Sequence, residues 1–317
     1  MKKVVISHKV MEEGLHALEG NCRIIMPPEG GFTNEQLADE LLDADAVLAA
    51  GDITQSMLAG AKKLKIISNH GAGYDRIDVA AATRYGIPVT NIPTATAIPT
   101  AEMALALLLC LERNMLDINR RLRSEPPENS FGMSREKMGH SLLGRRIGLI
   151  GMGHIGQKMA ALCDILGMEV VYYARNRRDV PYTYLPLDEL LSTCDVLSLH
   201  CPLTDETRGL IGERELQLMK PTSVLINTAR GAVVDHDALI DALKNGRLRG
   251  AGLDVFPDEP HIPEGLLTLP NVVLMPHYGT NTFEARVGMV EACCERILDA
   301  LDGKRPKNVV NPEIYAE

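Results

Sequence analysis

The sequence predicts an α/β protein with two parallel sheets whose faces are covered by helices. Short apolar runs alternate with segments of helical period along most of the 317 residues, which is the pattern of strands joined by crossover helices. The alternation comes in two series, one over residues 3–91 and one from residue 146 onward. A glycine-rich turn joins the first apolar run of the second series to the helical segment that follows it. These observations favour two α/β domains.

The first series is a complete small α/β unit. Its expected strands are Val4–Ser7, Arg23–Met26, Ala46–Ala49, Lys65–Ser68 and Pro88–Thr90, and its expected helices lie near 11–19, 34–42, 54–60 and 78–85. Prolines and small residues over 91–100 then indicate a linker or hinge. A long helix is expected over 101–122, and residues 123–140, which have no period, are expected to form an exposed arm.

The second series has the strand count of a doubly wound domain. Its six expected strands are 147–150, 169–173, 196–199, 223–227, 250–253 and 272–275, with helices between them. A last helix is expected over 283–301, followed by a polar tail.

The turn Gly151-Met-Gly153-His-Ile-Gly156 has the spacing of a dinucleotide-binding site. Gly151 allows a tight turn, Gly153 lets the backbone approach a pyrophosphate, and Gly156 lets the helix pack on the strand. The helix that begins there directs free N–H groups and the positive end of its dipole at the phosphates. Glycine turns between strands and helices are common, so the flanking strand and helix contribute as much to this prediction as the glycines do.

The segment after the second strand of this series favours NADP over NAD. An NAD site usually has Asp or Glu there, which binds the ribose 2′-hydroxyl. This chain instead has Ala174, followed by Arg175-Asn176-Arg177-Arg178. The small residue leaves room for a 2′-phosphate, and guanidinium groups bind phosphate oxygens in a bidentate way. The alternative is a basic turn that only faces solvent.

Charge and composition argue against several classes of function. A formal net charge of −9 disfavours nucleic acid and anionic membranes as partners, because both require a basic surface. No apolar segment approaches the roughly 20 residues of a membrane span, and the first residues lead directly into a strand, so we expect a cytoplasmic protein. Seven cysteines without C-x-x-C spacing indicate reduced thiols and no metal site.

Three polar residues, Arg230, Glu259 and His277, each follow an apolar run, where an open α/β sheet binds its ligands. A guanidinium there can bind and polarise a 2-oxo acid, and an imidazole whose charged form is favoured by a nearby carboxylate can give or take a proton. Each residue alone has a common structural explanation, as a surface charge, a loop residue or part of a turn. Their joint occurrence after a glycine turn favours an active site.

The order of the motifs along the chain is more specific than any one of them. They are Asn69-His-Gly71-Ala72-Gly73-Tyr-Asp75, Thr100-Ala-Glu102, Gly151-x-Gly153-x-x-Gly156, Cys201-Pro-Leu203, Asn227-Thr-Ala-Arg230-Gly231, Gly252-Leu-Asp254-Val-Phe-x-x-Glu259-Pro260 and Pro276-His277. At this spacing the chain resembles the D-isomer-specific 2-hydroxyacid dehydrogenases over nearly its whole length. The resemblance implies hydride transfer between a nicotinamide cofactor and C2 of a small 2-hydroxy acid.

The resemblance also implies roles for individual residues. Arg230 would bind the carboxylate and carbonyl of the substrate, and Glu259 would pair with the catalytic His277. The backbone N–H groups of Ala72 and Gly73 would hold the substrate carboxylate. The residues that would line the cofactor are His154 and Ile155 at the pyrophosphate, and Cys201, Thr228, Ala229, Asp254, His277 and Gly279 toward the nicotinamide.

The resemblance further implies two domains and a homodimer. A doubly wound Rossmann cofactor domain, residues 99–284, would be inserted in a smaller flavodoxin-like α/β substrate domain made of residues 1–98 and 285–317. The apolar first half of the expected helix 101–122 would suit a subunit interface, with packing inside the subunit as the alternative.

The chain departs from the family pattern at three places. Many members have Arg where this chain has His154, so backbone N–H groups would contribute more of the pyrophosphate binding here. The acid after the second strand is absent. Glyoxylate and hydroxypyruvate reductases often have a tryptophan in the 123–140 arm, whereas this chain contains no Trp. Phe131 or Met133 would take its place in the substrate pocket.

These observations lead us to expect an NADP-preferring reductase of a small 2-oxo acid such as glyoxylate or hydroxypyruvate. The first alternative is an NAD-linked member that acts on a D-2-hydroxy acid or, as phosphoglycerate dehydrogenase does, on a phosphorylated acid. A phosphorylated substrate would favour a basic group near the substrate loop, and the stretch Leu48–Thr54 offers none. A formate dehydrogenase is disfavoured because that family pairs its His with Gln, where this chain has Glu259. A non-enzymatic corepressor that senses the cofactor would keep the same three polar residues but would be expected to have extended disordered tails.

Overall fold

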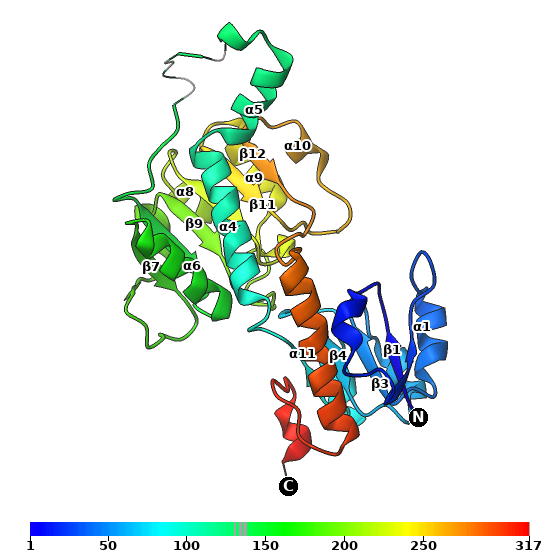
Figure 1. Ribbon diagram of the computed structural model, residues 1–317. Helices are drawn as coiled ribbons and strands as arrows, with labels where there is room; N and C mark the ends of the chain where they lie inside the picture. Colours follow the sequence, from blue (N-terminus) through cyan, green and yellow to red (C-terminus); the bar gives the residue numbers. More distant parts are fainter. Residues whose placement is uncertain (130, 133–134, 136–137, 317) are drawn as a thin grey trace. The chain divides into compact units, whose positions relative to one another are not determined.

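The computed structural model describes residues 1–129, 131–132, 135 and 138–316 (Figure 1). The chain divides into two compact units. Unit 1 consists of Met1–Thr96 and Asn281–Glu317, and unit 2 consists of Ala97–Thr280. Unit 2 is thus inserted in the sequence of unit 1. The two boundaries, after residues 96 and 280, lie a few residues before the boundaries expected after residues 98 and 284. Within the described residues, no helix combines the length and the apolar character needed to cross a bilayer.

Unit 1 contains a five-stranded parallel sheet with the order β2-β1-β3-β4-β5. The strands are β1 (Lys2–Ile6), β2 (Cys22–Ile25), β3 (Ala46–Ala49), β4 (Ile67–Asn69) and β5 (Val89–Thr90). The central strand β3 is buried along its whole length, as a strand covered on both faces must be. This strand order is the flavodoxin-like one, in which the carboxyl edge of the sheet is the place for ligands.

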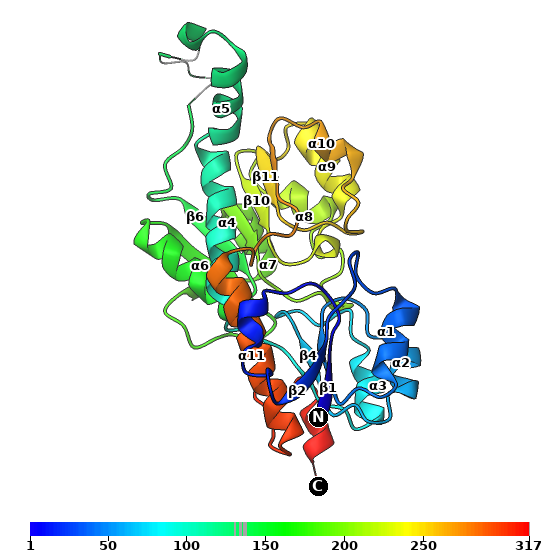
Figure 2. The ribbon, with the colours of Figure 1, turned by 45° about the vertical axis from the view of Figure 1, so that its right-hand side comes forward.

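Helices cover both faces of this sheet (Figure 2). One core lies under α1 (Asn34–Leu41), α2 (Gln55–Gly60) and α3 (Val79–Arg84). The other core lies under α11 (Phe283–Leu301), which the sequence predicted at these bounds. Alternate residues of β1 enter the two cores, Val5 the first and Val4 and Ile6 the second, so the apolar run of this strand is explained by its double coverage.

One segment of unit 1, the one after β1, differs from the predictions. The helix expected near 11–19 is wrong, since only a short 3-10 helix, η1 (Glu12–Leu15), forms there. Gly14, inside η1, packs so closely on α11 that a Cβ atom would lie 2.5 Å from Cβ of Val290. The polar tail is attached to the rest of unit 1 by Asn311, whose buried side chain accepts the N–H of Val89 and donates to the carbonyl of Ile87. The 3-10 helix η5 (Pro312–Tyr315) follows directly after Asn311.

Unit 2 contains a seven-stranded parallel sheet with the order β12-β11-β10-β9-β6-β7-β8. The strands are β6 (Arg146–Ile150), β7 (Glu169–Tyr173), β8 (Thr183–Tyr184), β9 (Val196–Leu199), β10 (Val224–Asn227), β11 (Gly250–Leu253) and β12 (Val272–Leu274). The expected count of six was wrong, because the two residues of β8 are too few to give a pattern. The chain runs outward from β6 in one direction and from β9 in the other, so the switch point of this Rossmann sheet lies between β6 and β9.

The sheet of unit 2 is also covered on both faces. The helices are α4 (Ala97–Glu112), α5 (Met115–Ser124), α6 (His154–Ile165), α7 (Leu187–Thr193), α8 (Glu213–Leu218), α9 (His236–Lys244) and α10 (Glu264–Leu267). Helices α4 and α6 share one core with the sheet, and α7 to α10 share the other. Leu107 and Leu108, which were expected at a subunit interface, are buried in the core beneath α4.

The single helix expected over 101–122 is wrong, because α4 and α5 are separate helices. Helix α4 already begins at Ala97, within the expected linker, and accommodates Pro99 in its first turn, where a proline has no N–H to lose. Asn114 has a left-handed φ of 49°, which a right-handed helix cannot contain, and α5 begins directly after it.

Candidate functional site

Arg230 lies in a braced turn at the carboxyl end of β10. The amide of Asn227 holds this turn, since its Nδ2 donates to the carbonyl of Arg230 (2.9 Å) and its Oδ1 accepts an N–H within the turn (3.0 Å). A Cβ atom on Gly231 would lie 2.0 Å from the carbonyl carbon of Phe256, so only glycine lets the turn pack on the segment after β11. This close approach places Arg230 next to the segment that contains Glu259.

Glu259 and His277 form a hydrogen-bonded pair. Oε2 of Glu259 lies 2.7 Å from Nδ1 of His277, and Oε1 accepts the N–H of Phe256 at 3.0 Å. Burial alone would raise the pKa of Glu259, but the hydrogen bonds from His277 and Phe256 outweigh it. With the added positive charge of Arg230, the pKa of this carboxyl lies below its ordinary value.

The ionised state of Glu259 determines the state of the imidazole that it contacts. A carboxylate can only accept hydrogen bonds, so Nδ1 of His277 has the proton of this contact. Nε2 has no hydrogen-bond partner among the described residues, and half of the side chain is exposed. The arrangement therefore presents Nε2 as the nitrogen that can exchange a proton with a ligand.

Asp254 holds the backbone of the segment that contains His277. Its buried carboxylate accepts the N–H of Tyr278 through Oδ1 and that of Gly279 through Oδ2, both at 2.7 Å. Its carbonyl accepts the N–H of His277 at 2.7 Å. Burial raises the pKa of Asp254, and the two N–H bonds oppose that effect without cancelling it. The resemblance implied only a cofactor contact for Asp254, so its hydrogen bonds to the backbone of this segment were not predicted.

The three bonds from Asp254 explain an unusual backbone conformation at His277. The φ angle of His277 is 58°, in the left-handed region that residues with a Cβ atom seldom adopt. Such a conformation persists only where surrounding contacts determine it. Asp254 supplies those contacts and thereby sets the position of the imidazole.

The glycine turn after β6 has room for a pyrophosphate. Gly151 has a φ of 97°, and a Cβ atom on Gly156 would lie 2.1 Å from the carbonyl oxygen of Gly151, so α6 lies directly on the turn. By contrast, a Cβ atom on Gly153 would meet nothing within 4 Å in the part of the chain that the structure describes. Helix α6 begins at His154 without a side-chain cap, so N–H groups of its first turn, including that of Ile155, are available to an anion.

Three other residues expected at the cofactor lie at the ends of neighbouring strands. Cys201 follows β9, Thr228 and Ala229 follow β10, and all three are nearly buried. The hydroxyl oxygen of Thr228 is buried without a hydrogen-bond partner among the described residues. An unsatisfied buried group of this kind costs roughly 1–3 kcal/mol, which a polar ligand would recover. This oxygen and the open space at Gly153 fit a dinucleotide at this edge of the sheet.

The basic segment after β7 is exposed and only weakly paired. Arg175 lies 3.5 Å from Glu206, and both side chains are largely exposed, so this ion pair contributes little. The guanidinium of Arg177 lies 4.8 Å from the ring centre of Tyr184. Asn176 between them is exposed. Two guanidinium groups are therefore available beside the strand end at which an adenosine ribose is bound in Rossmann domains.

The loop after β4 in unit 1 contains Ala72 and Gly73. Neither backbone N–H has a protein acceptor among the residues that the structure describes. Successive N–H groups without partners are the feature of backbone sites for anions. The loop thus has the groups that a carboxylate requires.

Two observations concern the residues expected on the substrate side. Arg76 was not predicted to matter, but its Nε and Nη2 donate to the two oxygens of Asp52 at 2.9 and 3.0 Å, which compensates its charge in the 48–54 loop. Of the two residues expected to replace the usual tryptophan, Phe131 is 77% exposed. Met133 lies outside the described residues.

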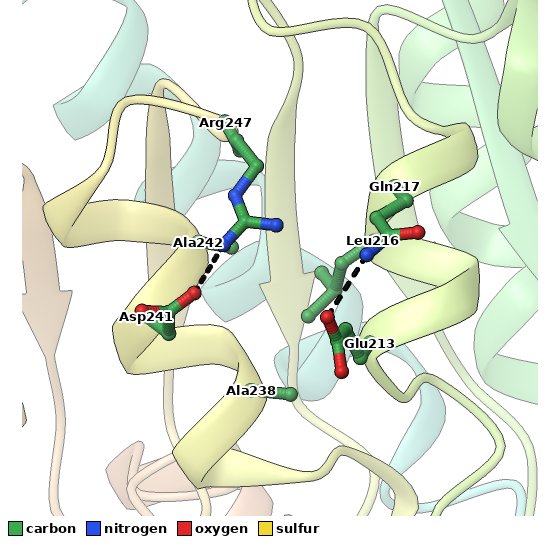
Figure 3. Close-up of a pocket in the computed structure, with 7 residues that line it drawn as sticks. All are labelled: Glu213, Leu216, Gln217, Ala238, Asp241, Ala242 and Arg247. Atoms are coloured by element: carbon green, nitrogen blue, oxygen red, sulfur yellow. Dashed lines mark hydrogen bonds and ion pairs between the residues drawn. The ribbon is translucent and has the colours of Figure 1, made fainter.

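A small hollow between α8 and α9 is too small for a ligand (Figure 3). Its volume of about 10 Å³ admits one water at most. Its polar side chains pair with one another: Glu213 with Gln217 on α8 (2.9 Å), and Asp241 of α9 with Arg247, which follows that helix. Among the described residues, no three His, Cys, Asp or Glu side chains form a group that could hold a metal, and the seven cysteines are free thiols.

A doubly wound sheet with an open glycine turn, and an imidazole–carboxylate pair beside a guanidinium at the same edge, define the class of dinucleotide-dependent dehydrogenases. The family model described as "D-isomer specific 2-hydroxyacid dehydrogenase, NAD binding domain" matches residues 105–279. The chain belongs to the D-isomer specific 2-hydroxyacid dehydrogenase family. The predicted family, the predicted two-domain α/β fold and the prediction of an oxidoreductase that acts on a CH–OH group are thereby confirmed.

Similar proteins match the chain along nearly its whole length. Glyoxylate reductase of Thermococcus litoralis is 40% identical over 98% of this chain and 97% of its own, and that of Pyrococcus furiosus is 39% identical over 98% and 96%. Among solved structures, an NADPH-dependent glyoxylate/hydroxypyruvate reductase from Sinorhizobium meliloti, in complex with NADP and malonate, is 30% identical with a TM-score of 0.87, over 98% of this chain and 96% of its own.

Proposed function

We propose that this chain is a reductase that uses NADPH to convert a small 2-oxo acid, glyoxylate or hydroxypyruvate, to the 2-hydroxy acid. The observation that carries this proposal is the Glu259–His277 pair, which leaves Nε2 of the imidazole to a ligand beside Arg230. Similarity to glyoxylate reductases over nearly the full length supports the substrate class. The NADP complex of the Sinorhizobium enzyme supports the cofactor.

Each residue of the proposed site has one task. A bound nicotinamide supplies the hydride for C2 of the acid. Nε2 of His277 gives a proton to the carbonyl oxygen as the hydroxyl forms, and takes it back in the reverse reaction. Glu259 stabilises the charged imidazole, and Arg230 orients and polarises the carbonyl. The N–H groups of Ala72 and Gly73 hold the carboxylate, which makes unit 1 the substrate domain and unit 2 the cofactor domain.

The activity test uses NADPH oxidation, followed by absorbance, with glyoxylate and hydroxypyruvate as substrates. His277→Ala should lower kcat by about 10²-fold or more, because positioned acid–base groups contribute about 10²–10⁴-fold. His261→Ala, an exposed histidine two residues after Glu259, is the matched control and should retain activity. Wild-type activity in His277→Ala would contradict the mechanism. Tight cofactor binding without turnover of any 2-oxo acid would favour the corepressor alternative.

The preference for NADP over NAD is tested at Arg175. Arg175→Asp should raise KM for NADPH about tenfold or more and lower KM for NADH, since a hydrogen bond to a charged group is worth about 1.5–3 kcal/mol. Glu206→Gln is the control, because it frees Arg175 from its exposed partner and should leave KM for NADPH unchanged or lower. An unchanged ratio of NADPH to NADH efficiency in Arg175→Asp would remove Arg175 from cofactor selection.

The proposal includes a homodimer in which α5 is covered by a second copy. No residue of α5 is buried, and three of its large apolar side chains, Met115, Leu116 and Leu122, are exposed. An amphipathic helix with an uncovered apolar face requires a partner to bury it. Light scattering should give twice the chain mass for the wild type and the single mass for Leu116→Glu/Leu122→Glu. A monomeric wild type would contradict the dimer.

We also propose that the protein works in the cytoplasm. Its seven cysteines are all free thiols, which is typical of a reducing compartment. Cell fractionation with the protein tagged at one end should place it with cytoplasmic markers.

A further inference from the structure

All three backbone carbonyls of the loop Gly71–Gly73 accept hydrogen bonds from asparagine side chains. Nδ2 of Asn69 donates to the carbonyl of Gly71 at 3.0 Å and to that of Gly73 at 2.9 Å. Nδ2 of Asn91 donates to the carbonyl of Ala72 at 2.8 Å. The assignment of the amide nitrogens follows from chemistry, since a carbonyl oxygen can only accept and the amide oxygen cannot donate.

Fixing a carbonyl also fixes an N–H group, because the peptide unit is planar and trans. The carbonyl of Gly71 shares its peptide plane with the N–H of Ala72, and the carbonyl of Ala72 shares its plane with the N–H of Gly73. Asn69, together with the N–H of Ile92, which also donates to the carbonyl of Gly71 at 3.1 Å, therefore sets the direction of the first N–H. Asn91 sets that of the second. In each plane the N–H points away from the asparagine that holds the carbonyl.

Asn69 is itself held rigidly. It is the last residue of β4 and is 6% exposed. Its carbonyl accepts a hydrogen bond from the thiol of Cys293 on α11 at 3.6 Å. The next residue, His70, donates its N–H to the carbonyl of Ala49 at the end of β3 at 2.7 Å. The start of the loop is thus attached to the sheet and to α11 at once.

We propose that Asn69 and Asn91 are positioning residues that aim the N–H groups of Ala72 and Gly73 at the carboxylate of the 2-oxo acid. This inference rests on the proposed function. The asparagines touch neither the acid nor the cofactor in this role; they act through the backbone. A carboxylate at either position would repel the loop carbonyls instead of binding them, so the N–H group of that peptide plane would lose the direction that the asparagine gives it.

The test compares three Asn→Asp variants that change no side-chain volume. Asn69→Asp and Asn91→Asp should each raise KM for glyoxylate and the inhibition constant of oxalate by the same factor, about tenfold or more, because charge-assisted bonds to the carboxylate are lost. Binding of NADPH, followed by fluorescence, should stay within about twofold, since the cofactor residues lie in unit 2. Asn311→Asp is the matched control: it is a buried asparagine of unit 1 that also binds backbone groups, at Val89 and Ile87.

The control separates positioning from general stability. Asn311→Asp should lower the melting temperature but leave KM and oxalate inhibition unchanged. If Asn311→Asp raises KM as much as Asn69→Asp does, or if folded Asn69→Asp and Asn91→Asp bind glyoxylate and oxalate like the wild type, the inference is wrong. Should Asn69→Asp fail to fold, the less buried Asn91 decides the question.

The same set of proteins tells the two proposals apart. If His277→Ala loses activity while Asn69→Asp and Asn91→Asp keep the wild-type KM, the positioning role is wrong and the proposed reductase function stands. A wild type that neither reduces glyoxylate or hydroxypyruvate nor binds oxalate would refute both.

Discussion

Nδ1 of His277 donates its hydrogen bond to a glutamate, Glu259, whose other oxygen is already bound to the backbone N–H of Phe256. The backbone bond keeps the carboxylate from rotating, so the direction of the imidazole is set along with its protonation. The pair therefore works as one unit, in which the negative charge of Glu259 lies against the imidazole ring.

Glu259→Gln tests this coupling. The amide keeps the shape of the side chain but loses the charge that stabilises the imidazolium, so kcat should fall about 10²-fold. The measurement is kcat, together with a profile of kcat/KM against pH. Glu264→Gln, an exposed glutamate at the start of α10, is the control and should keep the wild-type profile. Unchanged kcat and profile in Glu259→Gln would show that the contact has no catalytic role.

Two alanine substitutions in the glycine turn should have different consequences. Gly156→Ala places a Cβ atom 2.1 Å from the carbonyl oxygen of Gly151, so both the melting temperature and cofactor binding should fall. Gly153→Ala meets no described atom within 4 Å, so stability should hold while the new methyl group blocks the approach of a pyrophosphate. Calorimetry and NADPH fluorescence measure the two effects. Gly153→Ala with wild-type cofactor affinity would contradict the predicted position of the pyrophosphate.

Glu112, the last residue of α4, forms a buried ion triad with the residues directly before β6 and β11. Its oxygens lie 2.6 Å from Nη1 of Arg145 and 2.5 Å from Nη2 of Arg249, and its side chain is fully buried. Glu112→Gln leaves the two guanidiniums without their counter-charge, and the free energy of unfolding should fall by about 3 kcal/mol. Urea titration measures the loss. Glu169→Gln, which breaks an exposed pair with Arg146, should cost at most about 1 kcal/mol; equal losses in the two variants would contradict the prediction.

The pair His8–His70 in unit 1 predicts a dependence of stability on pH. Nε2 of His8 lies 2.8 Å from Nδ1 of His70, and burial, with the charge of Arg286, lowers the pKa of His8 from 6.5 to about 4 and that of His70 to about 3. Between about pH 6.5 and pH 4 the unfolded chain binds protons that the folded chain does not. The free energy of unfolding should therefore fall as the pH falls through this window, by about 1.4 kcal/mol for each unit of lowered pKa.

Variants isolate this effect from other histidines. His200 in unit 2 has a pKa lowered to about 4 by burial and contributes in the same direction, so His8→Gln/His70→Gln should reduce the pH dependence without abolishing it. His16→Gln is the control, because His16 is exposed, and it should leave the pH dependence unchanged. Melting temperatures between pH 7 and pH 4.5 give the comparison. A double variant with the wild-type slope would mean that the pair binds protons as readily in the folded chain as in the unfolded one.

Local patterns were sufficient for elements whose residues are all buried or strictly periodic, such as β3 and α11. They failed where distant contacts or single residues decide the structure. The segment near Gly14 forms only η1, and it packs on Val290, a contact with a residue far away in the sequence that no local pattern reports. The break at Asn114 depends on one left-handed residue, and β8 is a strand only because β7 offers it a partner.

The candidate site shows the same division. Arg230, Glu259 and His277 could be found from the sequence because each is an unusual residue type after a strand, in the order of a known family. The contribution of Asn69 could not be found, because its hydrogen bonds to loop carbonyls depend on how the backbone turns after β4. The dual use of Asp254 was missed for the same reason: its partners at Tyr278 and Gly279 are backbone groups without any sequence signature.

The hydrogen bonds between Asp254 and the backbone after His277 have a consequence for redesign of the enzyme. Both carboxylate oxygens accept hydrogen bonds from the backbone N–H groups of residues 278–279. Any shift of these two residues would therefore leave a buried negative charge without hydrogen-bond donors. The stretch that presents the imidazole thus has a single permitted shape. Substitutions that aim to change substrate specificity should therefore be made in the loops that bind the acid. Substitutions in residues 277–279 would lower kcat before they changed specificity.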